Sequence, residues 1–246
     1  MMLKRWFKFY KNRNVEVEDV SLDPEGQEPL ELTDEDFKPT PPKPKGPLNR
    51  LPPQKDLKLV VILYAIVGLV SSIYWGTSFQ EYLWLNKSIV FDDHQYWRAF
   101  TSVLIHADLG HYLANAPLFI VFGWFLRSFA GPIVFPYVLF CVGALTNLCT
   151  VYFYSPEAEL LGASGMVYAM VAFWLIIYIS FDADYVLPMR IFRSIGFSLI
   201  VMFPTTFQPR TSYLAHGIGF CLGLAFAIPF LPMIKKKLYP FSTAGE

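Results

Sequence analysis

Two short stretches of this sequence place a hydroxyl and an imidazole among apolar residues. Ser164 lies in Gly162-Ala163-Ser164-Gly165, and His216 lies in an apolar run that begins near residue 211. A serine hydroxyl becomes a nucleophile when a neutral imidazole accepts its proton, so this pair could carry out nucleophilic acyl transfer. Neither apolar run contains an acidic residue to orient the histidine. The sequence therefore predicts a Ser–His dyad rather than a triad.

A second set of polar residues could stabilise the oxyanion that such chemistry creates. His111 and Asn115 are four residues apart, so they share one face of a helix. Together with the backbone N–H of Ser164 at a helix start, they are suitable donors to an oxyanion. Tyr168, one turn after Ser164, could hold the ring of His216 by stacking. His106 lies just before the same helix as His111.

Each of these signals has a structural alternative. Gly and Ser are common at helix contacts in membranes, and Gly-x-Ser-Gly is not the Gly-x-Ser-x-Gly elbow of soluble hydrolases. His216 could equally be a packing or proton-relay residue. Gly219, Gly223 and Ala227 repeat every four residues, which indicates close packing of the last apolar helix against a neighbour.

The elements that carry these residues are long apolar stretches. Of the 246 residues, 54% are hydrophobic and 16% are charged, whereas a soluble domain has roughly a quarter charged residues. The runs are continuous rather than alternating, which favours helices over a barrel, and a helix needs about 20 apolar residues to cross a bilayer. Six spans are predicted, over residues 57–76, 111–130, 132–154, 164–181, 191–207 and 211–234. The fifth is the shortest and is interrupted by Pro204.

Basic residues predict the orientation of these spans. They precede the first span and, as Lys235–Lys237, follow the last, so both chain ends are expected in the cytosol. The even-numbered spans then begin at the outer face of the membrane. His111, Ser164 and His216 would all lie at one depth, slightly below the outer surface.

The segment between the first two spans, residues 77–110, is long for a loop and is expected to be structured or functional. Its rings are expected to lie partly in the membrane interface; they are Phe79, Tyr82, Trp84, Phe91, Tyr96, Trp97 and Phe100. The Trp97-Arg98 pair is more typical of an anchor than of a catalytic group.

Residues 1–55 differ from the rest of the chain, because they hold half of its charges and, in 39–53, seven of its nineteen prolines. They are predicted to form a largely disordered cytosolic extension with a Pro-rich linker. Alternatively, the basic and aromatic residues 3–13 could lie on an anionic membrane surface. The membrane domain is expected over 56–238, with a short cytosolic tail at 239–246.

Two classes of protein are disfavoured by the composition. The body of the chain has no basic cluster beyond Lys235–Lys237, which argues against nucleic-acid binding. Its three cysteines, Cys141, Cys149 and Cys221, all lie in apolar runs, which argues against a secreted domain held by disulfides.

Taken in order, the motifs resemble those of the rhomboid intramembrane serine proteases. The resemblance covers about residues 80–246, and Trp97-Arg98 is similar to that family's loop signature. The motifs are His106-x4-His111-x3-Asn115, Gly162-x-Ser164-Gly165 with Tyr168, and Ala215-His216-x2-Gly219-x3-Gly223. The resemblance implies an all-α membrane protein, a six-transmembrane-helix bundle that needs no cofactor or metal.

The resemblance also implies roles for individual residues. Ser164 would be the nucleophile and His216 its base, with His111, Asn115 and the Ser164 N–H forming the oxyanion hole. Tyr168 would pack on the catalytic imidazole. The substrates would be transmembrane proteins cut from a wet cavity that opens outside the cytosol, and the fifth span with residues 205–213 would be the gate.

One position departs from the family, and two other functions stay open. Rhomboids commonly carry a glutamate four residues before a glycine at the inner end of the second span, where this chain has Arg127 before Gly131. A rhomboid-like protein that binds membrane clients without cutting them is one alternative. A small proton-coupled transporter using His106, His111 and His216 is the other, disfavoured because no internal repeat or intramembrane carboxylate is seen. A bacterial inner membrane is the expected location; the substrate and the oligomeric state are not predicted.

Overall fold

A computed structural model of the protein describes residues 46–77, 79–202 and 212–240, and the fold below refers to these ranges. The predicted extension 1–55 lies outside the described residues up to position 45, as does most of the predicted tail 239–246. A short 3-10 helix, η1 (Pro47–Asn49), precedes the first long helix.

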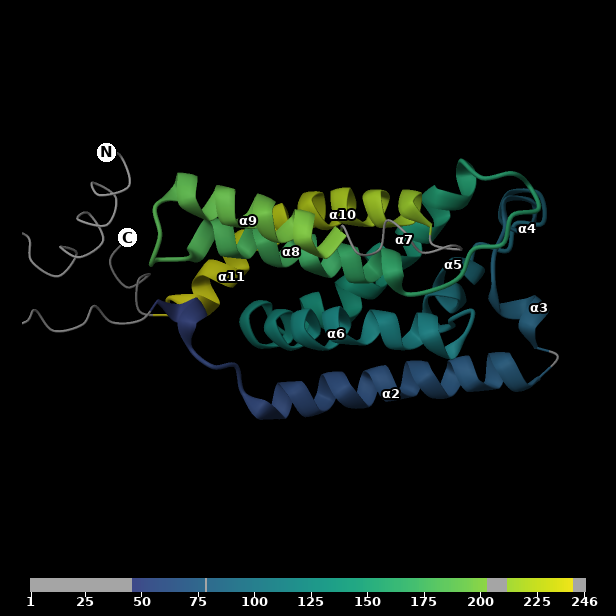
Figure 1. The fold of residues 1–246 in the computed structure, drawn as a ribbon, viewed down its shortest axis with the longest axis horizontal. Coiled ribbons are helices and arrows are strands. Elements are labelled where there is room, and N and C mark those ends of the chain that lie inside the picture. Colours follow the sequence, from purple (N-terminus) through teal and green to yellow (C-terminus); the bar gives the residue numbers. More distant parts are fainter. Residues whose placement is uncertain (1–45, 78, 203–211, 241–246) are drawn as a thin grey trace, which may run out of the picture. The chain divides into compact units, whose positions relative to one another are not determined.

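Five helical segments of the described chain are long and apolar enough to cross a membrane (Figure 1). Each agrees with a predicted span to within four residues at either end. They are α2 (Gln54–Gly76); α6 (Leu109–Phe125) continued by the π-helical η3 (Leu126–Ala130); the π-helical η4 (Ile133–Val138) continued by α7 (Leu139–Tyr152); α8 (Ser164–Phe181); and α10 (Tyr213–Ala227) continued by η6 (Ile228–Phe230) and α11 (Leu231–Leu238).

The predicted fifth span corresponds to α9 (Leu187–Met202), which is 16 residues long and is not one of these five. It begins four residues before the predicted start at residue 191. Pro188 lies at its second position, where the missing N–H of proline costs no intrahelical hydrogen bond. The predicted end of the span and residues 205–211 of the expected gate lie outside the described residues.

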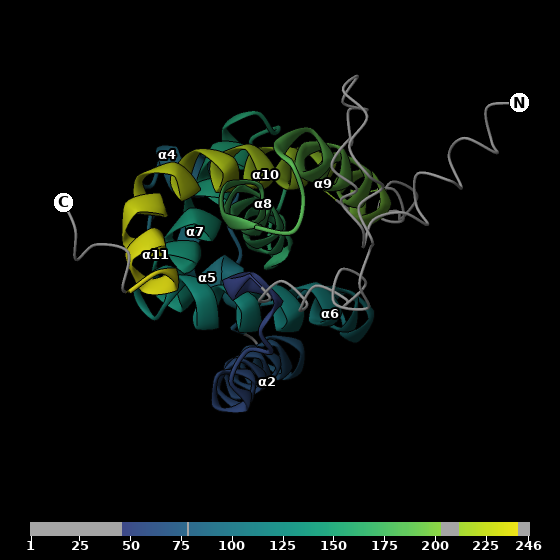
Figure 2. The ribbon, with the colours of Figure 1, turned by 90° about the vertical axis from the view of Figure 1, so that its left-hand side faces the viewer.

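Helix α8 is the central element of the bundle. Looking along the helices, Figure 2 shows it surrounded by α6, α7, α9 and α10, and it contacts all four. Its residues 165–173 are buried without interruption, which fits a sequence that is apolar on all sides. Helix α2 lies at the periphery and packs mainly on α6. The helix that begins at Ser164 is therefore held from most directions.

Small residues allow α10 to approach α8 at backbone distance. A Cβ atom at Gly223 would lie 2.3 Å from the carbonyl oxygen of Ala169, so no side chain fits at this position. Helix α7 approaches α8 in the same way, since a Cβ atom at Gly143 would lie 2.7 Å from Cβ of Met166. Apolar side chains are as favourable in contact with lipid as with another helix, so the hydrophobic effect does not drive helices together in a membrane. Close packing of this kind drives their association instead.

The segment between α2 and α6 is structured, as its length predicted. It forms four short helices: α3 (Gln80–Leu83), α4 (Lys87–Phe91), α5 (Arg98–Thr101) and the 3-10 helix η2 (Ser102–Leu104). Arg98 is 5% exposed and donates hydrogen bonds to the carbonyl oxygens of Glu81 and Trp84 and to the side chain of Gln95. Arg98 therefore holds this segment together, while Trp97 is half-exposed beside it.

Candidate active site

A tight turn sets the start of α8 at Ser164. Gly162 has a φ of +118°, a conformation that L side chains rarely adopt, and its N–H donates to the carbonyl oxygen of Ser102 at 2.8 Å. The chain then enters α8 with Ser164 as the first helical residue. The N–H groups of a first turn have no intrahelical acceptor, so the Ser164 N–H is available to an anion.

The start of α10 is fixed by Ser212. Its side chain accepts a hydrogen bond from the N–H of Ala215 at 3.1 Å and lies 2.5 Å from the hydroxyl of Tyr154, just beyond α7. Serine is a preferred residue at this capping position. His216 follows in the first turn of α10 and is buried.

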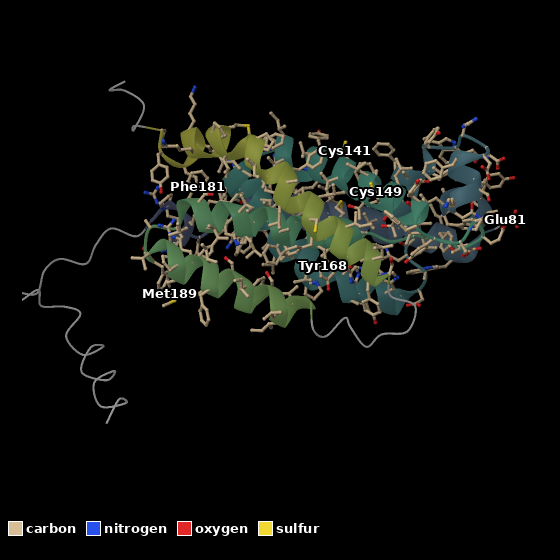
Figure 3. All side chains as sticks on the ribbon, turned by 90° about the horizontal axis from the view of Figure 1, so that it is seen from above. Glu81, Cys141, Cys149, Tyr168, Phe181 and Met189 are labelled. Carbon is tan, nitrogen blue, oxygen red and sulfur yellow. The ribbon has the colours of Figure 1, made fainter. Side chains whose placement is uncertain are left out.

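The beginnings of α8 and α10 meet through the rings of Tyr168 and His216. Their centroids are 4.1 Å apart and their planes differ by 16°, so the rings are stacked. Tyr168 lies one turn after Ser164, on the same face of α8. Figure 3 shows Tyr168 about midway along the length of the bundle. The imidazole of His216 is thus held on the face of α8 on which Ser164 lies one turn before Tyr168.

Backbone contacts bring the same two turns together. A Cβ atom at Gly165 would lie 3.4 Å from the carbonyl oxygen of Ala215, and one at Gly219 would lie 2.1 Å from that of Gly165. The neighbours of Ser164 and His216 in the sequence are therefore in contact. Ser164 itself is partly exposed, whereas Gly165 and Ala215 are buried.

His111 lies beside the turn that leads to Ser164. Asp108 caps α6 by accepting a hydrogen bond from the His111 N–H at 2.8 Å. A Cβ atom at Gly162 would lie 3.1 Å from Cε1 and 3.5 Å from Nε2 of His111, so the imidazole edge faces this turn. Asn115, one turn deeper, donates to the carbonyl oxygen of His111 at 3.1 Å. Its amide group has a second N–H that this bond does not use.

His106 lies behind His111 and is completely buried. The two rings are perpendicular, with centroids 5.4 Å apart, and Nδ1 of His106 lies 3.2 Å from Oγ of Ser71 in α2. Burial, and to a smaller extent the neighbouring His111, lower the pKa of His106 to about 3, while Asp108 opposes the shift. His106 is therefore neutral near pH 7. Within the described ranges, no three His, Cys, Asp or Glu side chains converge as metal ligands would.

Three residues that support this site were not identified from the sequence. Ser71 contacts His106, and Asn147 of α7 donates to the hydroxyl of Ser102 at 2.9 Å, next to the bond that Ser102 makes with Gly162. Ser71 and Asn147 lie inside apolar runs, where a polar side chain is a signal in its own right. Ser102 lies in a polar segment and gives no such signal.

The match to a family model covers α6, α7, α8, α9 and α10 but not α2. The Rhomboid domain model matches residues 93–233, which is more than half of the chain. A search of curated protein sequences found no match. The matched range includes His106, the turn before α8 and the start of α10. The described chain has five helices long and apolar enough to cross a membrane, so the protein is a multi-pass membrane protein. On this evidence the chain belongs to the rhomboid family.

Proposed function

We propose that this protein is an intramembrane serine endopeptidase that cleaves transmembrane or juxtamembrane segments of membrane proteins. Members of the rhomboid family are generally proteases of this kind. The observation that carries the proposal is the stack of His216 on Tyr168, one turn from Ser164. This stack supports a joint action of Ser164 as nucleophile and His216 as base, although the two residues are 52 positions apart in the sequence.

The proposed reaction has two halves. The neutral His216 imidazole takes the proton of the Ser164 hydroxyl as the oxygen attacks the scissile carbonyl carbon. The imidazolium then gives this proton to the leaving amine nitrogen, the C–N bond breaks, and an ester to Ser164 remains. A water molecule attacks the ester, His216 accepts its proton, and that proton returns to the Ser164 oxygen. The stacked ring of Tyr168 limits the motion of His216 between these transfers.

The negative oxygen of the tetrahedral intermediate needs fixed donors. The Ser164 N–H at the start of α8 and the His111 edge beside Gly162 converge on the same turn. Asn115 is 7% exposed and has one amide N–H beyond its bond to His111. Donors that are already in place when charge develops contribute most to such reactions.

The proposed orientation has both chain ends in the cytosol. Lys235–Lys237 of α11 and Arg190 of α9 lie at the end of α8 opposite Ser164, which supports a site near the outer surface by the positive-inside rule. Substrates would then be cut near the extracytosolic side. A bacterial inner membrane is the proposed location.

The proposal is tested with the full chain in proteoliposomes that also contain a single-span reporter substrate. We expect Ser164→Ala and His216→Ala each to lower the cleavage rate by at least about 10³-fold, because dyad members act as a unit. A fluorophosphonate probe, which needs no substrate, should label the wild-type protein and not Ser164→Ala.

The matched control is Ser180→Ala, an exposed serine near the other end of α8, which should retain cleavage and labelling. Cleavage that persists in both Ser164→Ala and His216→Ala would refute the dyad. A wild-type protein that binds the reporter but neither cleaves it nor reacts with the probe would indicate a rhomboid-like protein that holds clients without cutting them.

A further inference from the structure

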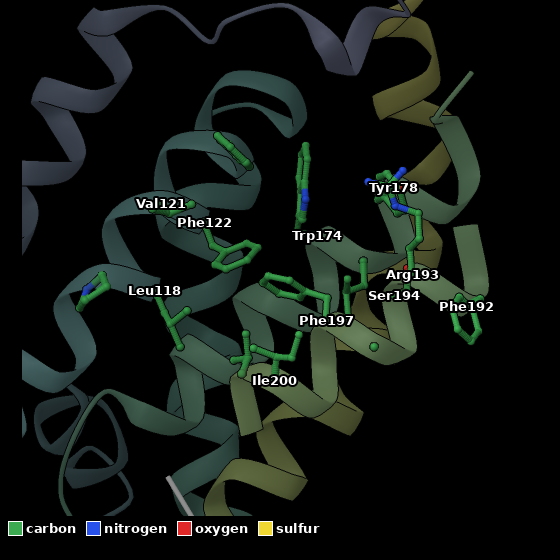
Figure 4. Close-up of a pocket in the computed structure, with 15 residues that line it drawn as sticks. Leu118, Val121, Phe122, Trp174, Tyr178, Phe192, Arg193, Ser194, Phe197 and Ile200 are labelled. Carbon is green, nitrogen blue, oxygen red and sulfur yellow. The ribbon is translucent and has the colours of Figure 1, made fainter. Parts of the chain in front are cut away.

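The imidazole of His106 has one nitrogen without a hydrogen-bond partner. His106 is completely buried, and its Nε2 is among the buried side-chain polar atoms that remain unpaired in the part of the chain that the structure describes. Buried polar atoms in native proteins almost always have a partner, so this nitrogen needs an explanation. The cavity between α6, α8 and α9 that Figure 4 shows does not account for it, because neither His106 nor His111 lines that cavity.

Helix α2 holds His106 at two points, although α2 lies outside the range that the family model matches. The indole N–H of Trp75 donates to the carbonyl oxygen of His106 at 2.7 Å, and Oγ of Ser71 lies 3.2 Å from Nδ1 of the ring. The carbonyl oxygen of Leu104 is 3.5 Å from the same Oγ, so the imidazole nitrogen is the closer acceptor for the hydroxyl proton. Both the backbone and the ring of His106 are therefore fixed by α2, which runs alongside α6 in Figure 1.

A hydroxyl that donates to Nδ1 decides where the proton of His106 lies. His106 is neutral near pH 7, because burial lowers its pKa to about 3. A neutral imidazole carries a single N–H, so a hydrogen bond accepted at Nδ1 leaves the proton on Nε2. The missing partner of Nε2 must then be an acceptor.

The ring of His111 offers such an acceptor. Its centre lies 5.4 Å from that of His106. Two imidazoles joined by a hydrogen bond of about 3.0 Å between their nitrogens have centres roughly 5 Å apart, so a small rotation of one ring would form the bond. The ring of Tyr112 is also perpendicular to His106, at 5.5 Å, but its π face is a weaker acceptor than a nitrogen lone pair.

The two nitrogens of His111 are placed differently with respect to Ser164. A Cβ atom at Gly162, two residues before Ser164, would lie 3.5 Å from Nε2, whereas Nδ1 is not within 4 Å of it. Nε2 is therefore the nitrogen nearer the turn where an oxyanion would form, and Nδ1 remains for His106. A donor to the oxyanion must carry its proton on Nε2, and a hydrogen bond accepted at Nδ1 favours that tautomer.

We propose that Ser71 and His106 are positioning residues that keep the proton of His111 on Nε2. The hydroxyl of Ser71 donates to Nδ1 of His106, Nε2–H of His106 donates to Nδ1 of His111, and Nε2–H of His111 donates to the oxyanion. The last of these three bonds rests on the proposed function, and the first two do not. Helix α2 thereby contributes to the reaction although it carries neither member of the dyad.

The first two bonds are tested without catalysis, by nitrogen NMR at pH 7 of the full chain labelled with ¹⁵N-histidine. The chain has four histidines, so single substitutions assign the signals. We expect His106 and His111 both to carry their protons on Nε2, with a coupling through the hydrogen bond between Nε2 of His106 and Nδ1 of His111. A proton on Nδ1 of either ring would overturn the proposal. So would a His106 N–H signal that responds to Tyr112→Leu but not to His111→Ala.

Reporter cleavage tests the consequence for the reaction. Ser71→Ala should lower kcat about tenfold, less than the roughly 10²–10³-fold that the loss of a whole oxyanion donor costs, and should leave KM nearly unchanged. In the NMR spectrum of Ser71→Ala, part of His111 should carry its proton on Nδ1. Ser71→Thr keeps a hydroxyl and should restore both properties. Ser72→Ala, which alters the exposed neighbouring serine, is the matched control.

The outcomes separate this inference from the proposed function. If Ser71→Ala and Ser72→Ala have the same kcat, or if Ser71→Ala lowers kcat while the His111 tautomer is unchanged, the positioning role is wrong even though the protein is a protease. If the wild type does not cleave the reporter, the proposed function fails, and the NMR spectrum still decides whether Ser71 and His106 fix the proton of His111.

Discussion

The carboxylate of Asp56, in the first turn of α2, lies 3.5 Å from Nε of Arg127 at the end of the second membrane helix. The same carboxylate accepts a hydrogen bond of 2.9 Å from the hydroxyl of Ser128. Arg127 occupies the region where rhomboids commonly have a glutamate. In this chain Arg127 pairs with an acidic residue of α2, so the contact joins two helices.

This contact predicts that Asp56 stabilises the fold. Both partners are partly buried, so Asp56→Asn should lower the free energy of unfolding by about 1 kcal/mol. A double-mutant cycle with Arg127→Gln should give a coupling energy of about 0.5–1 kcal/mol in titrations with sodium dodecyl sulfate. Lys58→Gln, which removes an exposed charge two residues further along α2, is the control. Additive effects of Asp56→Asn and Arg127→Gln would contradict a direct interaction.

Contact between α8 and α10 predicts a sharp difference between two glycines of α10. Gly219→Ala would place Cβ 2.1 Å from the carbonyl oxygen of Gly165, so the helices must separate, at a cost of about 1–3 kcal/mol. Because His216 lies on the same helix, cleavage should fall at least about tenfold with this loss. Gly217→Ala, which has no atom within 4 Å of its added Cβ, should be neutral or stabilising. Thermal unfolding and reporter cleavage measure both, and equal behaviour of the two variants would contradict the packing argument.

The stack between Tyr168 and His216 predicts that an aromatic ring is needed at position 168. Tyr168→Phe keeps the ring, whereas Tyr168→Leu removes it, so the leucine variant should lose about tenfold in kcat, the upper end of an aromatic pair's contribution. The KM of the reporter should change little, because the ring contacts the proposed base. Equal loss of kcat in both variants would show that the tyrosine hydroxyl matters more than the stack.

Much of the fold could be predicted because a bilayer imposes a simple rule on sequence. A spanning helix must satisfy its backbone internally and remain apolar over a fixed length, so the start of α8 at Ser164 and five of the six spans follow from composition. The start of α9 was less predictable. The polar residues Arg190, Arg193 and Ser194 obscure the boundary there, although the helix already begins at Leu187.

The contacts around the candidate site could be predicted only in part. The four-residue spacing of His111 and Asn115 indicates a shared helical face, and the repeat of small residues in α10 indicates close packing. Nothing in the local sequence shows that Ser102 bonds to Gly162, or that Asp56 rather than a glutamate pairs near Arg127. Such contacts join segments far apart in the chain, so they depend on how the helices pack and not on any local pattern.

The neutral state of His106 predicts an acid sensitivity of the fold. Its pKa is about 3 in the folded protein and about 6.5 when exposed, so below pH 6.5 the denatured state gains a proton that the folded state does not bind. Stability should therefore fall as the pH drops from about 6.5 towards 3, with a contribution from this group of up to about 1.4 kcal/mol per pH unit.

The substitution that isolates this contribution is His106→Asn, whose amide can still reach the hydroxyl of Ser71. Denaturation in sodium dodecyl sulfate between pH 7 and pH 5 should show a shallower loss of stability for His106→Asn than for the wild type. His94→Asn serves as the control, because His94 is exposed and its positive φ of 59° is one that asparagine tolerates. His94 is exposed and His106 is buried, so the two variants compare an exposed histidine with a buried one. If both variants change the pH dependence of the free energy of unfolding equally, the acid sensitivity does not arise from the burial of His106.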